Sequence, residues 1–284
     1  MKQIYWNGWT EVKKKVVSAR MGSVFFLVIA LVCALATGID AFMVDKQEWI
    51  TPWMAPHFFN NKFFVTFYGF IVCYMYSEVP FMNRSEMNFL LRKGRIVWCM
   101  EKVFAIIIQA SVLALFTFIM SVLIFIPHIQ FDMKWGKVIH TLAFSNNMWN
   151  YNIIGNASPV IIGKYEPLEA MFVCFIIVWM VTSLMGVLMF VLSLYGNRLT
   201  AVAVTVVMTG LTLAEGNFIT TTWLPYLTPF NWCRLGLHGQ PIFLDYFYPP
   251  LKVYLCLVFG GLFVLVLAVI WKSRHIEYVW NKEE

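Results

Sequence analysis

Charged residues are scarce in this chain. Only 13% of its 284 residues are Asp, Glu, Lys or Arg, whereas 60% are hydrophobic and 18% are aromatic. Average soluble domains carry roughly 25% charged residues, so the composition excludes an ordinary soluble protein. Alternation of apolar and polar residues is also missing, because runs such as VFFLVIALVCALA (residues 24–36) are apolar on every face. This excludes a transmembrane β-barrel and leaves helices as the spanning elements.

Motifs for phosphate or metal chemistry are absent as well. The sequence contains neither the G-x-x-x-x-G-K-[ST] phosphate loop nor H-E-x-x-H. Its histidines lie outside the long apolar runs and lack the spacing of metal ligands, which also argues against an intramembrane serine protease, since such an enzyme needs a histidine within a span. The six cysteines form no CxxC pair and suit apolar packing. We therefore expect no catalytic site, metal or cofactor on this chain.

Long apolar runs predict six transmembrane helices. A bilayer core about 30 Å thick needs roughly 20 apolar residues for each helical span. The first run exceeds the roughly 7–15 residues of a signal-peptide core and five more follow it, so we interpret it as a retained span rather than a cleaved leader. The expected fold class is an all-α integral membrane protein, with one six-span domain over residues 1–284. The spans are residues 21–42, 63–79, 103–126, 170–195, 199–214 and 251–271.

Lys and Arg residues fall mainly on one side of these spans. The segments before the first span, between the second and third, between the fourth and fifth, and after the sixth hold thirteen of the 21, without counting Lys102 at the membrane boundary. Because positive residues mark cytoplasmic loops, both termini are predicted to be cytoplasmic. The net charge of +6 then fits anionic membrane lipid, so we expect lipid contacts and no nucleic-acid partner.

Three segments outside the spans have patterns of their own. Residues 1–20 include an amphipathic stretch that favours a helix on the inner membrane surface. Residues 128–168 are polar and aromatic and predict a small ordered cap. In residues 215–250, Pro225 and Pro229 stop any long helix, which favours short re-entrant or interfacial helices.

A short charged helix is predicted at residues 83–95, between the second and third spans. Asn83 and Glu86 resemble a capping box, and Gly94 can end the helix. Its apolar stripe is formed by Met87, Leu90 and Leu91, while Phe89 points to the opposite side beside Glu86 and Lys93. Because it presents apolar groups on two sides, this helix needs a second surface to cover one of them. The alternative is a basic loop that only orients the protein in the membrane.

Acidic residues near the span interiors are limited to Asp40 and Glu215, both towards the outer ends. Glu215 is expected to join an outer polar cluster, since an unpaired carboxylate in the membrane is costly; ion coupling is the alternative. Four glycines in the spans predict close approaches between helices. They are Gly186, Gly210, Gly260 and Gly261.

The arrangement as a whole resembles the permease subunits of type 2 ABC transporters. The resemblance covers essentially the whole chain and includes the stretches LLRKGRIVWCMEK and YLTPFNW. It implies a dimer of permeases, either a homodimer or a pair of close paralogues, with two copies of a separate ATPase subunit that binds ATP and Mg. It also implies that residues 83–95 are the coupling helix that docks into the ATPase. The contact residues would be Glu86, Met87, Phe89, Leu90, Leu91, Arg92 and Lys93.

Short permeases of this kind include those of lantibiotic immunity and phenol-soluble modulin export. This similarity implies export of an amphipathic or antimicrobial peptide across the bacterial cytoplasmic membrane. Lipid, polysaccharide or drug export remains open, because apolar and aromatic spans suit these cargoes equally. A secondary transporter without an ATPase is the alternative from another class.

Overall fold

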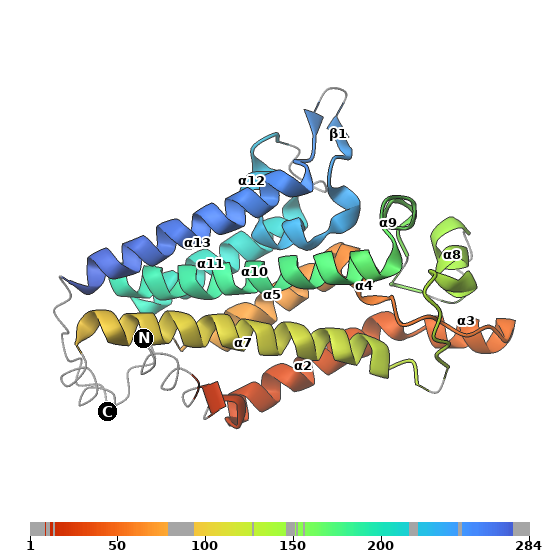
Figure 1. Ribbon diagram of the computed structural model, residues 1–284, viewed down its shortest axis with the longest axis horizontal. Coiled ribbons are helices and arrows are strands. Elements are labelled where there is room, and N and C mark those ends of the chain that lie inside the picture. The colour runs from red at the N-terminus through yellow and green to blue at the C-terminus, as the bar shows by residue number, and fades with distance from the viewer. Residues whose placement is uncertain are drawn as a thin grey trace.

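The computed structural model shows a bundle of long helices with smaller elements gathered at one end (Figure 1). The structure describes residues 9, 12–13, 15–78, 94–126, 128–145, 151, 153–155, 157–215, 221–243 and 246–274. The long helices are α2 (Ala19–Ala36), α5 (Lys62–Tyr76), α7 (Arg95–Leu123), α10 (Pro167–Tyr195), α11 (Arg198–Ala214) and α13 (Leu251–Ser273). The shorter elements are α3 (Ile39–Lys46), α4 (Ala55–Asn60), α8 (Gly136–Phe144), α9 (Pro159–Lys164), α12 (Leu224–Leu227), η2 (Pro229–Cys233), η3 (Leu235–Leu237), β1 (Pro241–Phe243) and β2 (Tyr246–Phe247).

Each of the six predicted runs overlaps one long helix, although the bounds differ. Among the described residues, the four helices α2, α7, α10 and α13 are long and apolar enough to cross a membrane. Helices α5 and α11 contain 15 and 17 residues, which corresponds to roughly 23 and 26 Å at 1.5 Å per residue. These lengths are below the hydrocarbon thickness of about 30 Å. The chain is therefore an all-α membrane protein with four clear candidate spans and two shorter apolar helices.

Helix α10 lies at the centre of the bundle, where it packs against α5, α7, α11 and α13. Gly186 permits the closest of these approaches, because a Cβ atom there would lie 2.6 Å from Ile106 of α7 and 2.8 Å from Tyr76 of α5. Gly261 also faces a neighbour, with Leu184 at 3.1 Å from its would-be Cβ. These two predicted close approaches are confirmed. The other two, Gly210 and Gly260, make no such approach within this chain, since a Cβ atom at either position would meet no atom of a neighbouring element within 4 Å.

The long helices alternate in direction along the bundle (Figure 1). The starts of α2 and α11 and the end of α5 meet at one end, where Arg20 and Arg198 both contact Ser77. The end of α13 joins them through Lys272, whose amino group lies 5.1 Å from the Tyr195 ring of α10. The shorter elements named above lie at the opposite end.

The predicted first span, residues 21–42, is not one continuous helix. Helix α2 ends at Ala36, and α3 begins after Gly38, which has a φ of 86°. Only glycine adopts this conformation without steric cost, so the chain breaks at this point even though its composition stays apolar. The hydropathy of residues 21–42 therefore did not reveal the break between α2 and α3.

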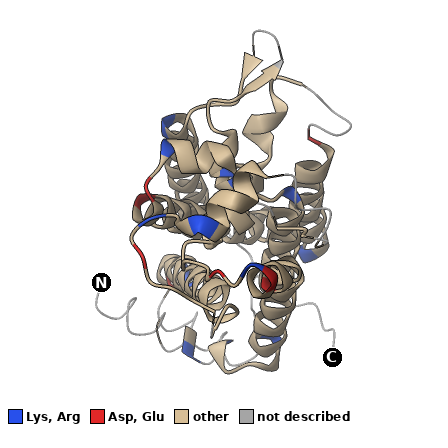
Figure 2. Cartoon of the chain, turned by 90° about the vertical axis from the view of Figure 1, so that its right-hand side faces the viewer, with Lys and Arg blue, Asp and Glu red and all other residues tan. Residues whose placement is uncertain are grey.

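Helices α3, α8 and α9 form a cap over one side of the bundle end. Two backbone hydrogen bonds join the segment after α3 to the segment before α8. The Ile50 N–H donates to the His128 carbonyl (3.1 Å), and the Gln130 N–H donates to the Ile50 carbonyl (2.9 Å). The Thr51 hydroxyl adds a bond to the Trp135 carbonyl at 2.8 Å. Figure 2 looks onto this end, with charged positions scattered over the connecting segments and helix ends.

Residues 221–243 and 246–250 contain more than the short helices expected for this segment. Helix α12 and the turns η2 and η3 are followed by the antiparallel hairpin of β1 and β2, which projects from the bundle end (Figure 1). The expectation of helices alone therefore missed two short strands. The rings expected at the membrane interface divide into two kinds: Trp223 and Tyr226 are exposed, whereas Phe230 and Trp232 are buried.

Candidate functional site

The predicted coupling residues Glu86, Met87, Phe89, Leu90, Leu91, Arg92 and Lys93 lie outside the described residues, so their assignment stays a prediction. The structure describes the two ends that flank them. Helix α5 and its turn run to Glu78, and α7 begins at Arg95 after Gly94, whose φ is 85°. The backbone therefore departs from helical geometry at Gly94, where the sequence predicts that the charged helix ends.

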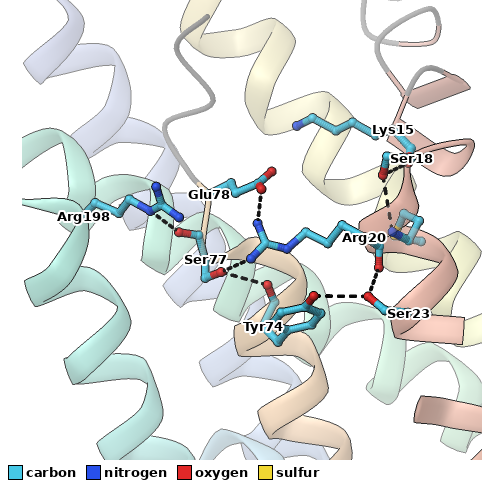
Figure 3. A network of polar contacts seen from close by, with 9 residues as sticks. Lys15, Ser18, Arg20, Ser23, Tyr74, Ser77, Glu78 and Arg198 are labelled. Carbon is cyan, nitrogen blue, oxygen red and sulfur yellow. Dashed lines mark hydrogen bonds and ion pairs between the residues drawn. The ribbon is translucent and has the colours of Figure 1, made fainter. Parts of the chain in front are cut away.

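A polar cluster surrounds the end of α5, immediately before this segment (Figure 3). The guanidinium of Arg20 donates to the Ser77 hydroxyl at 2.6 Å and forms an ion pair with Glu78, also at 2.6 Å. The Nε atom of Arg198 donates to the Ser77 carbonyl at 2.6 Å. We call Arg20, Tyr74, Ser77, Glu78 and Arg198 the α5-end cluster. Through it, α2 and α11 both hold the end of α5.

Local structure explains how Arg20 reaches this position. The Ser18 hydroxyl caps α2 by accepting the Met21 N–H at 3.3 Å, which places Arg20 in the first turn of the helix. The guanidinium lies 4.7 Å from the centre of the Tyr74 ring, a geometry that suits a cation–π contact. The Tyr74 hydroxyl in turn shares a hydrogen bond with Ser23 at 3.2 Å. Arg20, on the first turn of α2, is thus held against the last turn of α5 by its contacts with Tyr74 and Ser77.

Helix electrostatics favour this cluster at α5. The carbonyl end of a helix carries a partial negative charge, which cations stabilise. No basic residue lies in the last turn of α5 itself. Arg20 and Arg198, supplied by two other helices, provide the missing positive charge. The sequence analysis did not identify these residues, although opposite charges at the predicted same-side ends of the first two spans were a usable signal.

A second polar cluster surrounds Glu215 at the opposite end of the bundle. Glu215 is only 5% exposed and follows the last residue of α11. Its Oε2 atom accepts hydrogen bonds from the Thr228 hydroxyl, at 2.6 Å, and from the Asn231 amide. The Lys62 amino group, at the start of α5, donates to the Glu215 backbone carbonyl. The structure therefore places the carboxylate among polar partners from three segments, which we call the Glu215 cluster.

The neighbouring Arg234 extends this cluster towards α4. Its Nε atom donates to the Asn60 carbonyl at 2.9 Å, and its Nη1 atom lies 3.4 Å from the Asn231 amide oxygen. Burial lowers the pKa of Arg234, and the charges of Tyr248 and Glu215 oppose this shift. The Oε1 atom of Glu215 is buried without a hydrogen-bond partner among the described residues. The site thus places two cationic side chains, Lys62 and Arg234, within electrostatic reach of one carboxylate.

The η2 turn seats the Glu215 cluster between the long helices. It packs against α5, α10 and α11, with Phe230, Asn231 and Trp232 all buried. The Trp232 indole donates to the Pro225 carbonyl at 2.7 Å, which closes the turn on itself. The stretch YLTPFNW therefore supplies the polar partners of Glu215, and its buried apolar side chains pack between α5, α10 and α11.

The two buried histidines act as packing groups. The Nδ1 atom of His57 accepts the Ser158 N–H at 3.0 Å, and its ring lies against Trp135 with centroids 4.9 Å apart. Burial lowers the pKa of His57 to about 3, and it lowers the pKa of His238 to about 4. Both rings are therefore neutral near pH 7. Within the described ranges, no group of three or more His, Cys, Asp and Glu residues could hold a metal ion.

Comparisons of this chain with protein-family models, with curated proteins and with solved structures each find no match. The fold and the two clusters define the class of the protein as a multi-pass α-helical membrane protein. The two polar clusters lie at opposite ends of the bundle, where they tie helices together.

Proposed function

We propose that this chain is the membrane-spanning subunit of an ATP-driven type 2 ABC exporter in the bacterial cytoplasmic membrane. All six long helices cross the membrane in this proposal, and both termini are cytoplasmic. Residues 83–95 form the coupling helix. Two copies of an ATPase subunit bind ATP and Mg, and a second permease copy, identical or closely related, completes the dimer. The chain itself carries no catalytic site.

One observation carries this proposal: the segment that contains the predicted coupling residues joins two helices at the end of the bundle where α2 starts and α13 finishes. The described basic residues at this end include Arg20, Arg95, Arg198, Lys272 and Arg274. A positive end facing the cytoplasm agrees with the bias of positive residues in membrane proteins. The arrangement supports a docking element for a cytoplasmic partner between α5 and α7.

The buried η2 turn supports the re-entrant part of the proposal. Its Phe230 packs against Gly69, in the middle of α5, so this segment reaches well below the helix ends. Irregular backbone is tolerated at membrane depth where protein surrounds it. The shorter lengths of α5 and α11 fit the same picture, because η2 and the Glu215 cluster fill the space beyond their ends.

For the cargo, we propose an amphipathic or antimicrobial peptide. The support is the apolar and aromatic surface of the bundle, which includes exposed Phe26, Phe67, Phe259, Phe263 and Trp271. Such a surface suits a cargo that enters from the lipid. Lipids, polysaccharides and drugs are the alternative cargoes of the same machine.

A secondary transporter is the second candidate, and Glu215 is the observation that favours it. A buried carboxylate is the kind of group that couples transport to protons or ions. In this alternative the chain works without an ATPase.

The decisive experiment has two steps: to look for an ABC ATPase gene beside the gene for this chain, and to test whether that ATPase co-purifies with the chain. Truncating Phe89 and Leu90 to Ala should reduce the recovery of the ATPase, because a few apolar anchors usually dominate an interface, at about 2 kcal/mol or more each. The matched control replaces Arg92, Lys93 and Arg95 with Gln. If residues 83–95 only orient the protein, this control should disturb the topology while the Phe89/Leu90 variant keeps full binding.

Full retention of the ATPase by the Phe89/Leu90 double variant would overturn the coupling-helix assignment. Transport that needs no ATP and stops in Glu215→Gln would support the secondary transporter instead. The same purified complexes then serve to identify the cargo, by measuring which peptide or lipid stimulates ATP hydrolysis.

A further inference from the structure

We propose that Arg20 and Arg198 are positioning residues that fasten the end of α5 to α2 and α11, so that a displacement of the segment after Glu78 moves all three helices together. This inference rests on the proposed function, because it assigns the displacement to a docked ATPase. It goes further by naming the residues through which the movement enters the bundle.

The first step of the argument is the position of the contacts. Ser77 caps α5, and Glu78 is the last described residue before the segment that holds the predicted coupling residues. Arg20 grips the side chains of both residues, and Arg198 grips the backbone carbonyl of Ser77. No residue separates these contacts from the start of the moving segment. A force on that segment therefore acts first on Ser77 and Glu78, which the two arginines hold, and only then on the rest of α5.

The second step is the strength and geometry of these contacts. The arginines make two hydrogen bonds to Ser77 and one ion pair to Glu78, each over 2.6 Å, and contacts with one or both partners ionised are stronger than neutral ones. Arg20 thus contacts two consecutive residues, through a hydrogen bond to Ser77 and an ion pair with Glu78. The last turn of a helix frays readily. Without these bonds, a pull on the segment after Glu78 would unwind the turn at Ser77 instead of moving α5.

The third step concerns the cost of placing Arg198 where it is. Arg198 is the first residue of α11, and a positive charge at the start of a helix is unfavourable with the helix dipole. The capping box of Asn197 and Thr200 already satisfies this helix start, so α11 does not need the arginine for its own cap. The side chain serves α5 instead. A cation that disfavours its own helix while binding a neighbour points to a role in connecting the two helices.

Another connection runs from the same end of α5 into the other side of the bundle. The buried Tyr76 hydroxyl donates to the Ile106 carbonyl of α7 at 2.9 Å, and its ring packs at Gly186 of α10. This contact comes from the residue just before Ser77, whose side chain is buried inside the bundle. It holds α5 in the bundle, whereas the arginines act at the surface where the segment begins. Tyr76→Phe is therefore a matched control that removes one hydrogen bond of α5 without touching the α5-end cluster.

The test uses the full complex with the ATPase, reconstituted in vesicles, and measures the stimulation of ATP hydrolysis by cargo. The variants are Arg20→Glu, Glu78→Arg, the combined Arg20→Glu/Glu78→Arg swap, Arg198→Gln and Tyr76→Phe. We expect Arg20→Glu and Arg198→Gln to lower the stimulation about three- to tenfold, the range typical of residues that carry coupling between sites. Recovery of the ATPase and its unstimulated hydrolysis should stay at the unmodified level, because the docking residues are intact.

The charge swap distinguishes positioning from simple damage. In Arg20→Glu/Glu78→Arg the ion pair is restored with reversed polarity, and stimulation should return to within about twofold of the unmodified complex if the pair is what transmits the movement. Tyr76→Phe should lower thermal stability and leave the stimulation unchanged. The proposal is overturned if the Arg20→Glu variant keeps full stimulation, if the swap recovers nothing, or if Tyr76→Phe uncouples as strongly as Arg198→Gln.

The two levels of the proposal fail differently. An unmodified complex that does not bind the ATPase overturns the proposed function. An ATPase that binds normally to variants with unchanged stimulation overturns only the role of the arginines. If Arg20→Glu does not fold, the Arg198→Gln variant tests the proposal instead. The Arg198 side chain lies at the surface, and its replacement removes a single hydrogen bond.

Discussion

The ring of Phe230 lies directly against Gly69, a residue in the middle of α5. A Cβ atom at position 69 would lie 2.7 Å from the Cδ2 atom of Phe230 and 2.7 Å from the Thr209 methyl group of α11. Real Cβ atoms do not come this close to other atoms, so only glycine fits between α5, α11 and the η2 turn. The packing of η2 against α5 and α11 therefore depends on the absence of a side chain at position 69.

Gly69→Ala should loosen this packing. The added methyl group must displace Phe230 or Thr209, and overpacking of this kind costs about 1–3 kcal/mol. We expect a lower unfolding temperature in detergent and faster proteolysis near residues 221–237. Gly210→Ala is the matched control, because its Cβ would meet nothing within 4 Å. An unfolding temperature that falls equally in both variants would contradict the close packing at Gly69.

Glu215 offers a graded test of its cluster. Glu215→Gln keeps an oxygen atom that can accept from Thr228 and Asn231, so its loss of stability should be small. Glu215→Ala leaves both buried donors without an acceptor, at a cost of about 1–3 kcal/mol. Thermal unfolding of the two variants should therefore rank Ala below Gln. Equal unfolding temperatures would show that the hydrogen bonds to Oε2 do not stabilise the site.

Stability should fall in mild acid because of His57. Its pKa is about 3 in the folded protein, against about 6.5 in an unfolded chain. Between these values the unfolded state binds more protons, so the free energy of unfolding decreases as the pH falls through this window. The loss from this residue between pH 7 and pH 5 is about 2 kcal/mol.

The measurement is the unfolding temperature at pH 7 and pH 5 for the unmodified protein and for His57→Asn. The asparagine oxygen can still accept the Ser158 N–H, but it does not titrate. The variant is expected to be less stable at pH 7, since it loses the ring contact with Trp135, and to show a smaller drop at pH 5. An unchanged pH dependence would mean that His57 is not the buried group responsible.

The orientation in the membrane can be tested with single cysteines in a Cys256→Ser background, since Cys256 is exposed. Phe131, which is 84% exposed, lies at the cap end, and the exposed Arg274 lies at the other. We expect an impermeant maleimide to label Phe131→Cys in intact cells and Arg274→Cys only in permeabilised cells, because positive residues stay cytoplasmic. The reverse pattern would invert the topology and remove the coupling segment from the cytoplasm. Trp232 does not suit such labelling, because it is buried.

The helices were the predictable part of this fold, because uninterrupted apolar runs such as residues 170–195 leave the chain few alternatives in a membrane. The break at Gly38 was not predictable from hydropathy, since it depends on one backbone angle inside an apolar run. The Glu215 cluster was expected from the cost of a buried carboxylate, but its partners Thr228 and Asn231 follow from the fold of the η2 turn. The contact of Arg20 with Ser77 joins residues that lie 57 positions apart, and no local pattern marks such a pair.

The backbone bridge between Ile50 and Ile129 sets an order of events during synthesis. Ile50 leaves the ribosome together with the first span, but its partner belongs to chain that follows α7. The Thr51 hydroxyl likewise waits for the Trp135 carbonyl, 84 residues further on. At roughly 5–20 residues per second, the bridge stays open for several seconds, while the chain through α5 and α7 is synthesised. The cap therefore closes late, over helices that have already been made.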